Sequence, residues 1–214
     1  MDNISWLEQR WFALMARLNP TANKMEVSRW WKCLKEAYTQ THRHHHTLEH
    51  IAFGLAQLDR VRDRLSCADT VEYAWWFHDM VYLPQAQDTN ESLSADEAEK
   101  CAEELKLSVK KEMVRHLILA TSHHHPAQTE DEKMMMDIDL SILGTPWPIY
   151  WTYAKRIRKE YVPYFGAWKY RLGRLRFLSH MRKQRIFQTD FFRAIEASAQ
   201  KNVKKEMCFL AILL

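Results

Sequence analysis

The segment from Leu48 to Leu65 constrains the fold most, because its apolar residues recur at helical spacing. They occupy positions 48, 51, 52, 55, 58, 61 and 65, which places them on one side of a helix. The string His46-Thr47-Leu48-Glu49-His50 leads into this segment. Positions four apart share a helix face, so His46 and His50 converge if the helix already begins at residue 46.

A second helix is predicted from Val71 to Tyr82, and its centre, Ala74-Trp75-Trp76-Phe77, is apolar nearly all round. Such a helix belongs in the middle of a bundle. His78 and Asp79 follow directly and should therefore be buried. Buried imidazole and carboxylate groups are costly unless each finds a partner, so this dipeptide is a candidate site.

The rest of the chain also favours helices. Only 4 Gly and 6 Pro occur among 214 residues, which argues for long helices with short connections. We predict an all-α fold forming a single domain over 1–214, with a ligand-bearing core at about 43–145 and a basic C-terminal part at about 148–207. The other predicted helices cover residues 5–18, 26–38, 94–105, 109–122, 134–143, 148–161, 164–181 and 190–207.

Composition limits the cellular setting. The four cysteines lie far apart without a C-x-x-C pair, which is typical of reduced, packed thiols. The N-terminus lacks an apolar signal-like run, and no stretch reaches the length of a transmembrane helix. We therefore expect a cytoplasmic protein that does not enter a membrane.

Positive charge is concentrated late in the chain. From Trp151 to Lys205 there are 15 Lys and Arg against 3 Asp and Glu. These charges are either solvated helix faces or groups that bind anions, and a phosphate-bearing substrate would suit the second interpretation. Nucleic-acid binding is the less favoured alternative, because the chain has no recognised binding motif.

Histidines and carboxylates recur in a pattern that suits a metal ion. His50, His78, Asp79 and a late aspartate in Asp137-Ile138-Asp139 combine imidazole and carboxylate donors. Such a mixed donor set accepts Mn, Fe, Zn, Ni or Mg and is typical of hydrolytic metal sites. Asp137 and Asp139 face nearly opposite sides of a helix, so one of them enters the site. The Asp-Leu-Ser context favours Asp139, and Asp137 would then be an ordinary surface carboxylate.

The order His50, His78-Asp79, Asp139 resembles the H…HD…D pattern of HD-domain metal-dependent phosphohydrolases. The resemblance extends from about Arg43 to Asn202 and is carried by the strings FHDMVY, NESLSA, LILATSHH, DIDLSILG, IRKEY and YRLGRLRFL. These strings are most similar to a subgroup of predicted phosphohydrolases of unknown substrate. More distantly, the chain resembles the catalytic domain of cyclic-nucleotide phosphodiesterases. Their Tyr-His-Asn motif is replaced here by His45-His46-Thr47, which leaves the role of His46 open.

The resemblance implies an HD-type helical bundle with His50, His78, Asp79 and Asp139 as ligands of a divalent metal. It makes His46 a proton donor or a phosphate contact. His123 and His124 would contribute to a second metal or contact the phosphate, or form a solvated helix end. Asn90 and Glu91 would close the mouth of the site, although Glu91 would serve equally as a helix cap. The candidates for phosphate binding are Arg158, Arg171 and Arg174, any of which is otherwise a surface charge.

Together these features predict hydrolysis of a phosphomonoester or phosphodiester. The expected substrate is a small phosphorylated molecule such as a nucleotide. Asp79 would orient the attacking water, and His46 would protonate the leaving alkoxide, because an imidazole titrates near neutral pH. The alternative within the same resemblance is a metal-bound sensor that binds a nucleotide without turnover.

Overall fold

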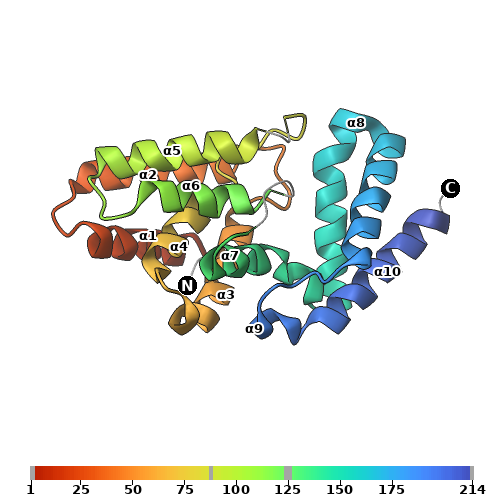
Figure 1. The fold of residues 1–214 in the computed structure, drawn as a ribbon. Coiled ribbons are helices and arrows are strands. Elements are labelled where there is room, and N and C mark those ends of the chain that lie inside the picture. The colour runs from red at the N-terminus through yellow and green to blue at the C-terminus, as the bar shows by residue number, and fades with distance from the viewer. Residues whose placement is uncertain (1–2, 87–88, 123–126, 213–214) are drawn as a thin grey trace. The chain divides into compact units, whose positions relative to one another are not determined.

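The computed structural model describes residues 3–86, 89–122 and 127–212, and all regular structure within these ranges is helical (Figure 1). The predicted all-α fold is therefore confirmed. The α-helices are α1 (Asn3–Leu18), α2 (Lys24–Tyr38), α3 (Leu48–Val61), α4 (Ala68–Phe77), α5 (Asn90–Glu104), α6 (Lys111–Ala120), α7 (Glu130–Leu140), α8 (Trp147–Lys183), α9 (Asp190–Arg193) and α10 (Glu196–Ile212). The short 3-10 helices are η1 (Arg62–Arg64) and η2 (Ser141–Gly144).

The chain divides into two compact units, Met1–Met135 and Met136–Leu214. The first unit holds α1 to α6 and the start of α7. The second holds the end of α7, η2 and α8 to α10. The division falls inside the stretch of 43–145 that was predicted as the ligand-bearing core.

Helix α4 is the centre of the first unit, as its apolar sequence predicts. It packs against α1, α3, α5 and α6, and every residue from Val71 to Phe77 is buried. The large rings interlock edge to face, with the Trp11 and Trp76 centroids 5.7 Å apart and those of Trp30 and Phe77 6.0 Å apart. Such aromatic pairs add to the stabilisation from burial of their area.

One charged residue, Glu72, is buried in this apolar helix. Its carboxylate accepts hydrogen bonds from Arg10 Nε at 2.9 Å, Arg17 Nη2 at 2.9 Å and Arg62 Nη1 at 2.8 Å. A buried charge is tolerated only when it is paired. These three guanidinium groups therefore make the position of α4 relative to α1 and η1 specific.

In the second unit, α8 runs as two helical arms joined at Gly166, which has φ 75° and ψ 158°. This backbone conformation is essentially restricted to glycine. The chain reverses there, and the second arm returns beside the first (Figure 1). The predicted break between Tyr161 and Tyr164 is thus displaced to Gly166, and Pro163 lies inside the first arm.

A buried polar cluster joins α8 to α10. Arg174 Nε and Nη2 donate to the two oxygens of Glu206 at 2.9 and 3.0 Å. Tyr150 also donates to Glu206, and Arg174 Nη1 lies 3.3 Å from the Tyr153 hydroxyl. Burial is the largest influence on the pKa of Tyr150, and together with the Glu206 charge it raises that pKa. The phenol therefore stays protonated and continues to donate.

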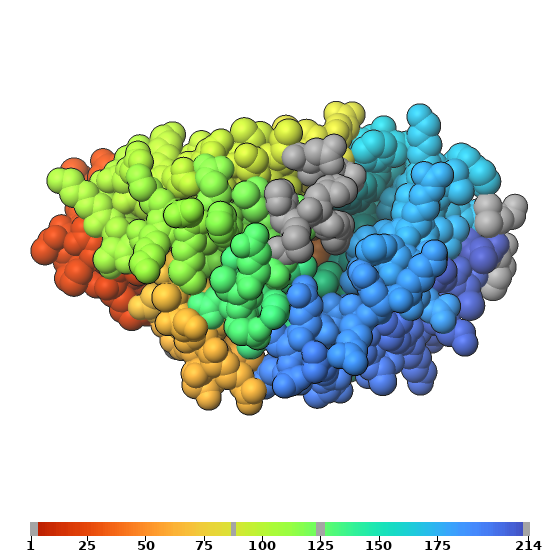
Figure 2. Space-filling model, in the orientation of Figure 1, coloured from red at the N-terminus to blue at the C-terminus, as the bar shows by residue number. Residues whose placement is uncertain are grey.

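The exposed surface of α8 and α10, cyan to blue in Figure 2, carries most of the predicted basic charge. Exposed Lys and Arg side chains occur on both helices: Lys155, Arg158, Lys159, Lys169, Arg176, Arg182, Lys183, Lys201, Lys204 and Lys205. None of the helices in the described ranges is long and apolar enough to cross a membrane.

Replacement of Gly166 by alanine should destabilise the second unit. An alanine at φ 75° and ψ 158° is strained, and we expect a loss of about 1–3 kcal/mol in the free energy of unfolding. The measurement is urea unfolding followed by circular dichroism.

Gly173→Ala is the matched control, because Gly173 lies in the second arm of α8, where an added methyl group would meet nothing within 4 Å and φ is not positive. This change should stabilise the protein by about 0.5–1 kcal/mol. Equal effects of the two substitutions would contradict the assigned turn.

Candidate metal centre

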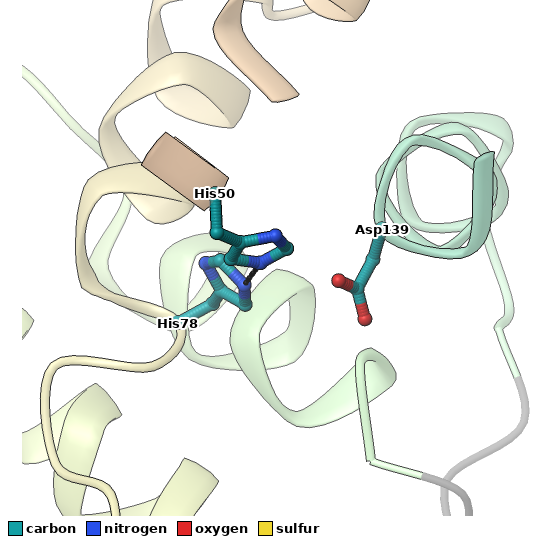
Figure 3. A group of neighbouring side chains, drawn as sticks. All are labelled: His50, His78 and Asp139. Carbon is teal, nitrogen blue, oxygen red and sulfur yellow. Dashed lines mark hydrogen bonds between the residues drawn. The ribbon is translucent and has the colours of Figure 1, made fainter. Parts of the chain in front are cut away.

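Three side-chain donor atoms converge where α4 ends. His50 Nε2 lies 3.1 Å from His78 Nε2. Asp79 Oδ2 lies 3.0 Å from His78 Nε2 and 3.4 Å from His50 Nε2. Figure 3 shows the two imidazoles turned toward each other, one from α3 and one from the end of α4. Both imidazole side chains are 1% exposed and the Asp79 side chain is 18% exposed, so the three atoms meet at the border of the core.

The spacing of these atoms suits a shared metal ion. Ligands bonded at about 2.1 Å to one ion lie about 3.0 Å apart in octahedral and about 3.4 Å apart in tetrahedral coordination. The three observed separations of 3.0, 3.1 and 3.4 Å fall within this range. Asp139, also drawn in Figure 3, belongs to the second unit and is a further carboxylate of the type that binds metal ions.

His78 is oriented by its own helix. Its Nδ1 lies 2.8 Å from the carbonyl oxygen of Trp75, and its ring stacks on the Trp75 indole at a centroid distance of 4.1 Å. A carbonyl only accepts hydrogen bonds, so Nδ1 carries the hydrogen and Nε2 presents its lone pair to the cluster. In a metal-binding histidine, the ring nitrogen that does not bind the metal usually donates its hydrogen to a group such as a backbone carbonyl.

The predicted helix from Val71 to Tyr82 is wrong at its C-terminal end. α4 ends at Phe77, His78 is its C-cap, and Asp79 lies in the following turn. Asp79 therefore projects from a turn and not from the predicted helix. The turn instead directs the Asp79 carboxylate toward the same point as His78 Nε2.

Close packing of α3 on α4 sets the distance between the two histidines. A side-chain carbon at Gly54 of α3 would overlap the indole ring of Trp75, so only glycine permits this approach. Trp75 Nε1 donates to the carbonyl oxygen of Ile51 at 3.0 Å. Packing and hydrogen bonding together hold the two helices in one register.

The start of α3 positions His50. Thr47 is the N-cap, and its hydroxyl accepts a hydrogen bond from Glu49 N at 3.3 Å. Thr47 thus supplies the side-chain acceptor that a helix N-terminus requires. His50 is the third residue of the helix, and its ring lies 5.1 Å from that of Trp75.

The environment of Asp79 favours its ionised form. Burial is the largest influence and would raise the pKa of this carboxyl. The positive charges that His78 and His46 carry when protonated, with the hydrogen bonds that protonated His50 and His78 donate to the carboxylate, act in the opposite direction. Their combined effect holds the pKa of Asp79 well below its ordinary value. The carboxylate is consequently available as a ligand at neutral pH.

His46 lies near the cluster but not on α3. The helix begins at Leu48, so the condition that residue 46 is helical is not met. The loop still brings its ring to 5.9 Å from the ring of His50 and 4.2 Å from that of Tyr82. His46 is half-buried. His46 therefore borders the cluster from a loop, and not from the helix that its four-residue spacing from His50 indicated.

Sequence reasoning missed two residues beside the centre. His45 is buried, and its ring centroid lies 4.9 Å from those of both His46 and His50. Arg43 is also buried and donates to backbone carbonyl groups of the Asp79 turn. Both residues lie in the polar stretch that precedes His46. That stretch has no hydrophobic periodicity from which their burial could be predicted.

The two late aspartates have different environments within the second unit. Asp137 is fully buried and accepts hydrogen bonds from Gln188 N, Thr189 N and Thr189 Oγ1 at 2.6–3.1 Å. The prediction of a surface carboxylate there is wrong, because Asp137 anchors the segment before α9. Burial is the main cause that raises its pKa. Asp139 is half-buried in the last turn of α7.

Asn90 and Glu91 begin α5, four residues before the predicted start at Ser94. Asn90 is buried, and its side-chain amide forms two 3.1 Å hydrogen bonds with the backbone N and O of Leu83. It thereby holds the loop that follows Tyr82. Glu91 is half-buried in the first turn. Their predicted contact with substrate stays a prediction.

The three predicted phosphate-binding arginines all lie on α8. Arg174 is buried against Glu206, and Arg171 is buried with Nη2 3.4 Å from the carbonyl oxygen of Ala211. The alternative interpretation of Arg171 and Arg174 as surface charges is therefore wrong. Arg158 is exposed. The other candidates, His123 and His124, lie outside the described residues.

Comparison of the chain with protein-family models, curated proteins and solved structures finds no match. The HD-type resemblance is therefore carried by the sequence strings alone.

Gly54→Ala should separate α3 from α4 and destabilise the first unit. The added methyl group meets the Trp75 ring, and overpacking of this kind costs about 1–3 kcal/mol. Thermal unfolding measures the loss, and near-ultraviolet circular dichroism reports the change around Trp75. Gly173→Ala, the same substitution at an open position, is the control. An unchanged melting temperature for Gly54→Ala would show that the contact between α3 and α4 accommodates the added methyl group.

Proposed function

We propose that this protein is a metal-dependent phosphohydrolase of the HD type, which cleaves a phosphomonoester or phosphodiester. The observation that carries the proposal is the convergence of His50 Nε2, His78 Nε2 and Asp79 Oδ2 within 3.0–3.4 Å of one another. The order of these residues in the chain supports it. A nucleotide is the substrate class to test first.

We assign His50, His78, Asp79 and Asp139 as the protein ligands. Two imidazoles and two carboxylates suit Mn, Fe, Zn, Ni or Mg. The hydrogen bond from His78 Nδ1 to Trp75 supports the assignment, because it fixes the ligand nitrogen.

The bound ion would supply water of lowered pKa and polarise the phosphoryl oxygen. Asp79 would orient the attacking water through a carboxylate oxygen. His46 would protonate the leaving alkoxide, and its half-buried position beside Tyr82 supports an imidazole that reaches solvent. Of the three predicted phosphate-binding arginines, Arg158 is exposed, and it is the one that we retain as a candidate.

The test is metal analysis of untagged protein, followed by phosphate release from a panel of nucleotides and sugar phosphates with each metal. We expect about one divalent ion bound per chain, and turnover of at least one phosphate ester. His78→Ala should lose both. Metal binding without turnover would favour the sensor alternative, and absence of metal binding would reject the centre.

Comparison of Asp139→Asn with Asp137→Asn in the same assays tests whether Asp139 is the fourth ligand. Asp139→Asn should lose metal. Asp137→Asn should keep metal but unfold at lower temperature, because it weakens the buried contacts to Gln188 and Thr189.

Substitution of His46 and His50 should separate proton transfer from metal binding. His50→Ala should lose metal and turnover together. His46→Ala should keep the metal and lower kcat by about 10²–10⁴-fold, the usual contribution of a general acid. The loss should be smallest for nitrophenyl phosphate, whose leaving group needs no proton. If His46→Ala empties the site, then His46 is a ligand.

A further inference from the structure

Arg43 is a buried guanidinium that no part of the proposed chemistry uses. It lies in the loop between α2 and α3, three residues before His46, and is 5% exposed. Its guanidinium carbon lies 5.2 Å from the ring centroid of Tyr38 and 5.3 Å from that of Tyr82. Burial of a permanent charge is costly, so the groups around it must compensate.

Its hydrogen bonds go to backbone carbonyl groups on both sides of the candidate centre. Nη1 donates to the carbonyl oxygen of Asp79 at 2.7 Å and to that of His46 at 3.2 Å. Nη2 donates to the carbonyl oxygen of Met80 at 2.7 Å. Nε donates to the side-chain oxygen of Gln40 at 3.0 Å. One planar group therefore connects the His46 loop to the turn that carries Asp79.

The Asp79 turn requires such a donor. Asp79 and Met80 lie in the turn after the C-cap His78, beyond the hydrogen-bonding pattern of the helix, so their carbonyl groups need donors from elsewhere. A positive charge is also favourable at this end of a helix. Without the guanidinium, the backbone on which the Asp79 carboxylate depends would lose two of its hydrogen bonds.

We propose that Arg43 is a positioning residue that holds the Asp79 carboxylate and the His46 imidazole in fixed relation to His50 and His78. The inference rests on the proposed metal centre, and it adds that this centre needs Arg43 although Arg43 contacts neither metal nor substrate. Lysine cannot replace it fully, because an ammonium group lacks the planar fork that serves separate acceptors.

The experiment measures binding of Mn²⁺ by calorimetry, and of Co²⁺ by its visible absorption spectrum, to the full chain. Arg43→Met should weaken metal binding by at least about tenfold, the usual effect of losing a group that orients a ligand. Arg43→Lys should recover part of the affinity and give an altered Co²⁺ spectrum, because the carboxylate is held less firmly.

Arg10→Met is the matched control. Arg10 is likewise a guanidinium with several partners in the first unit, namely Glu72 and Asp59. Its loss should lower the melting temperature but leave Mn²⁺ affinity and the Co²⁺ spectrum unchanged below the unfolding transition. A loss of affinity restricted to the Arg43 variants would separate positioning from general stability.

The outcomes distinguish this inference from the proposed function. If the wild-type chain binds neither ion, the metal centre is wrong, and the inference falls with it. If it binds both ions and the Arg43 variants bind equally well, only the role of Arg43 is wrong. Should Arg43→Met fail to fold, Arg43→Lys carries the test, and an unaltered affinity and spectrum in that variant would overturn the inference.

Discussion

The indole ring of Trp75 occupies the space where any residue other than glycine at position 54 would place its side chain. His50 precedes Gly54 by four residues on α3, and His78 follows Trp75 by three along α4, so each histidine shares a face with one half of this contact. The separation of the two Nε2 atoms, 3.1 Å, is thus a consequence of backbone packing. Large apolar rings in the first unit keep that packing in place.

The end of α4 shows how a buried helix terminus becomes a site. Three carbonyl groups at this helix end and in the turn after it accept hydrogen bonds from side chains: Trp75 O from His78 Nδ1, Trp76 O from Tyr38, and Asp79 O from Arg43. Each hydrogen bond removes the cost of a buried acceptor and also orients a ring or a backbone segment. Stability and the geometry of the donor atoms therefore depend on the same contacts.

The sequence alone predicted the helical class, the one-sided α3 and the burial of α4, because periodicity and apolar runs report on burial directly. It also located His50, His78 and Asp79, which the structure brings together. It did not predict that α4 ends at Phe77, since neither proline nor glycine follows. The packing at Gly54, the hydrogen bonds of Arg43 and the anchoring of Gln188 by Asp137 depend on residues distant in sequence. Local pattern carries no information on such pairs.

The hydrogen bond from His78 Nδ1 to Trp75 also determines how hydrogen atoms are distributed in the pair of imidazoles. Because His78 keeps its hydrogen on Nδ1, its Nε2 accepts, and the 3.1 Å contact is complete when His50 donates from Nε2. A ligand nitrogen must instead present a lone pair. His50 therefore has two tautomers with different uses, one that bonds to His78 and one that binds a cation. Only His50 can change between these tautomers, because the hydrogen bond from His78 Nδ1 to the Trp75 carbonyl oxygen already fixes the tautomer of His78.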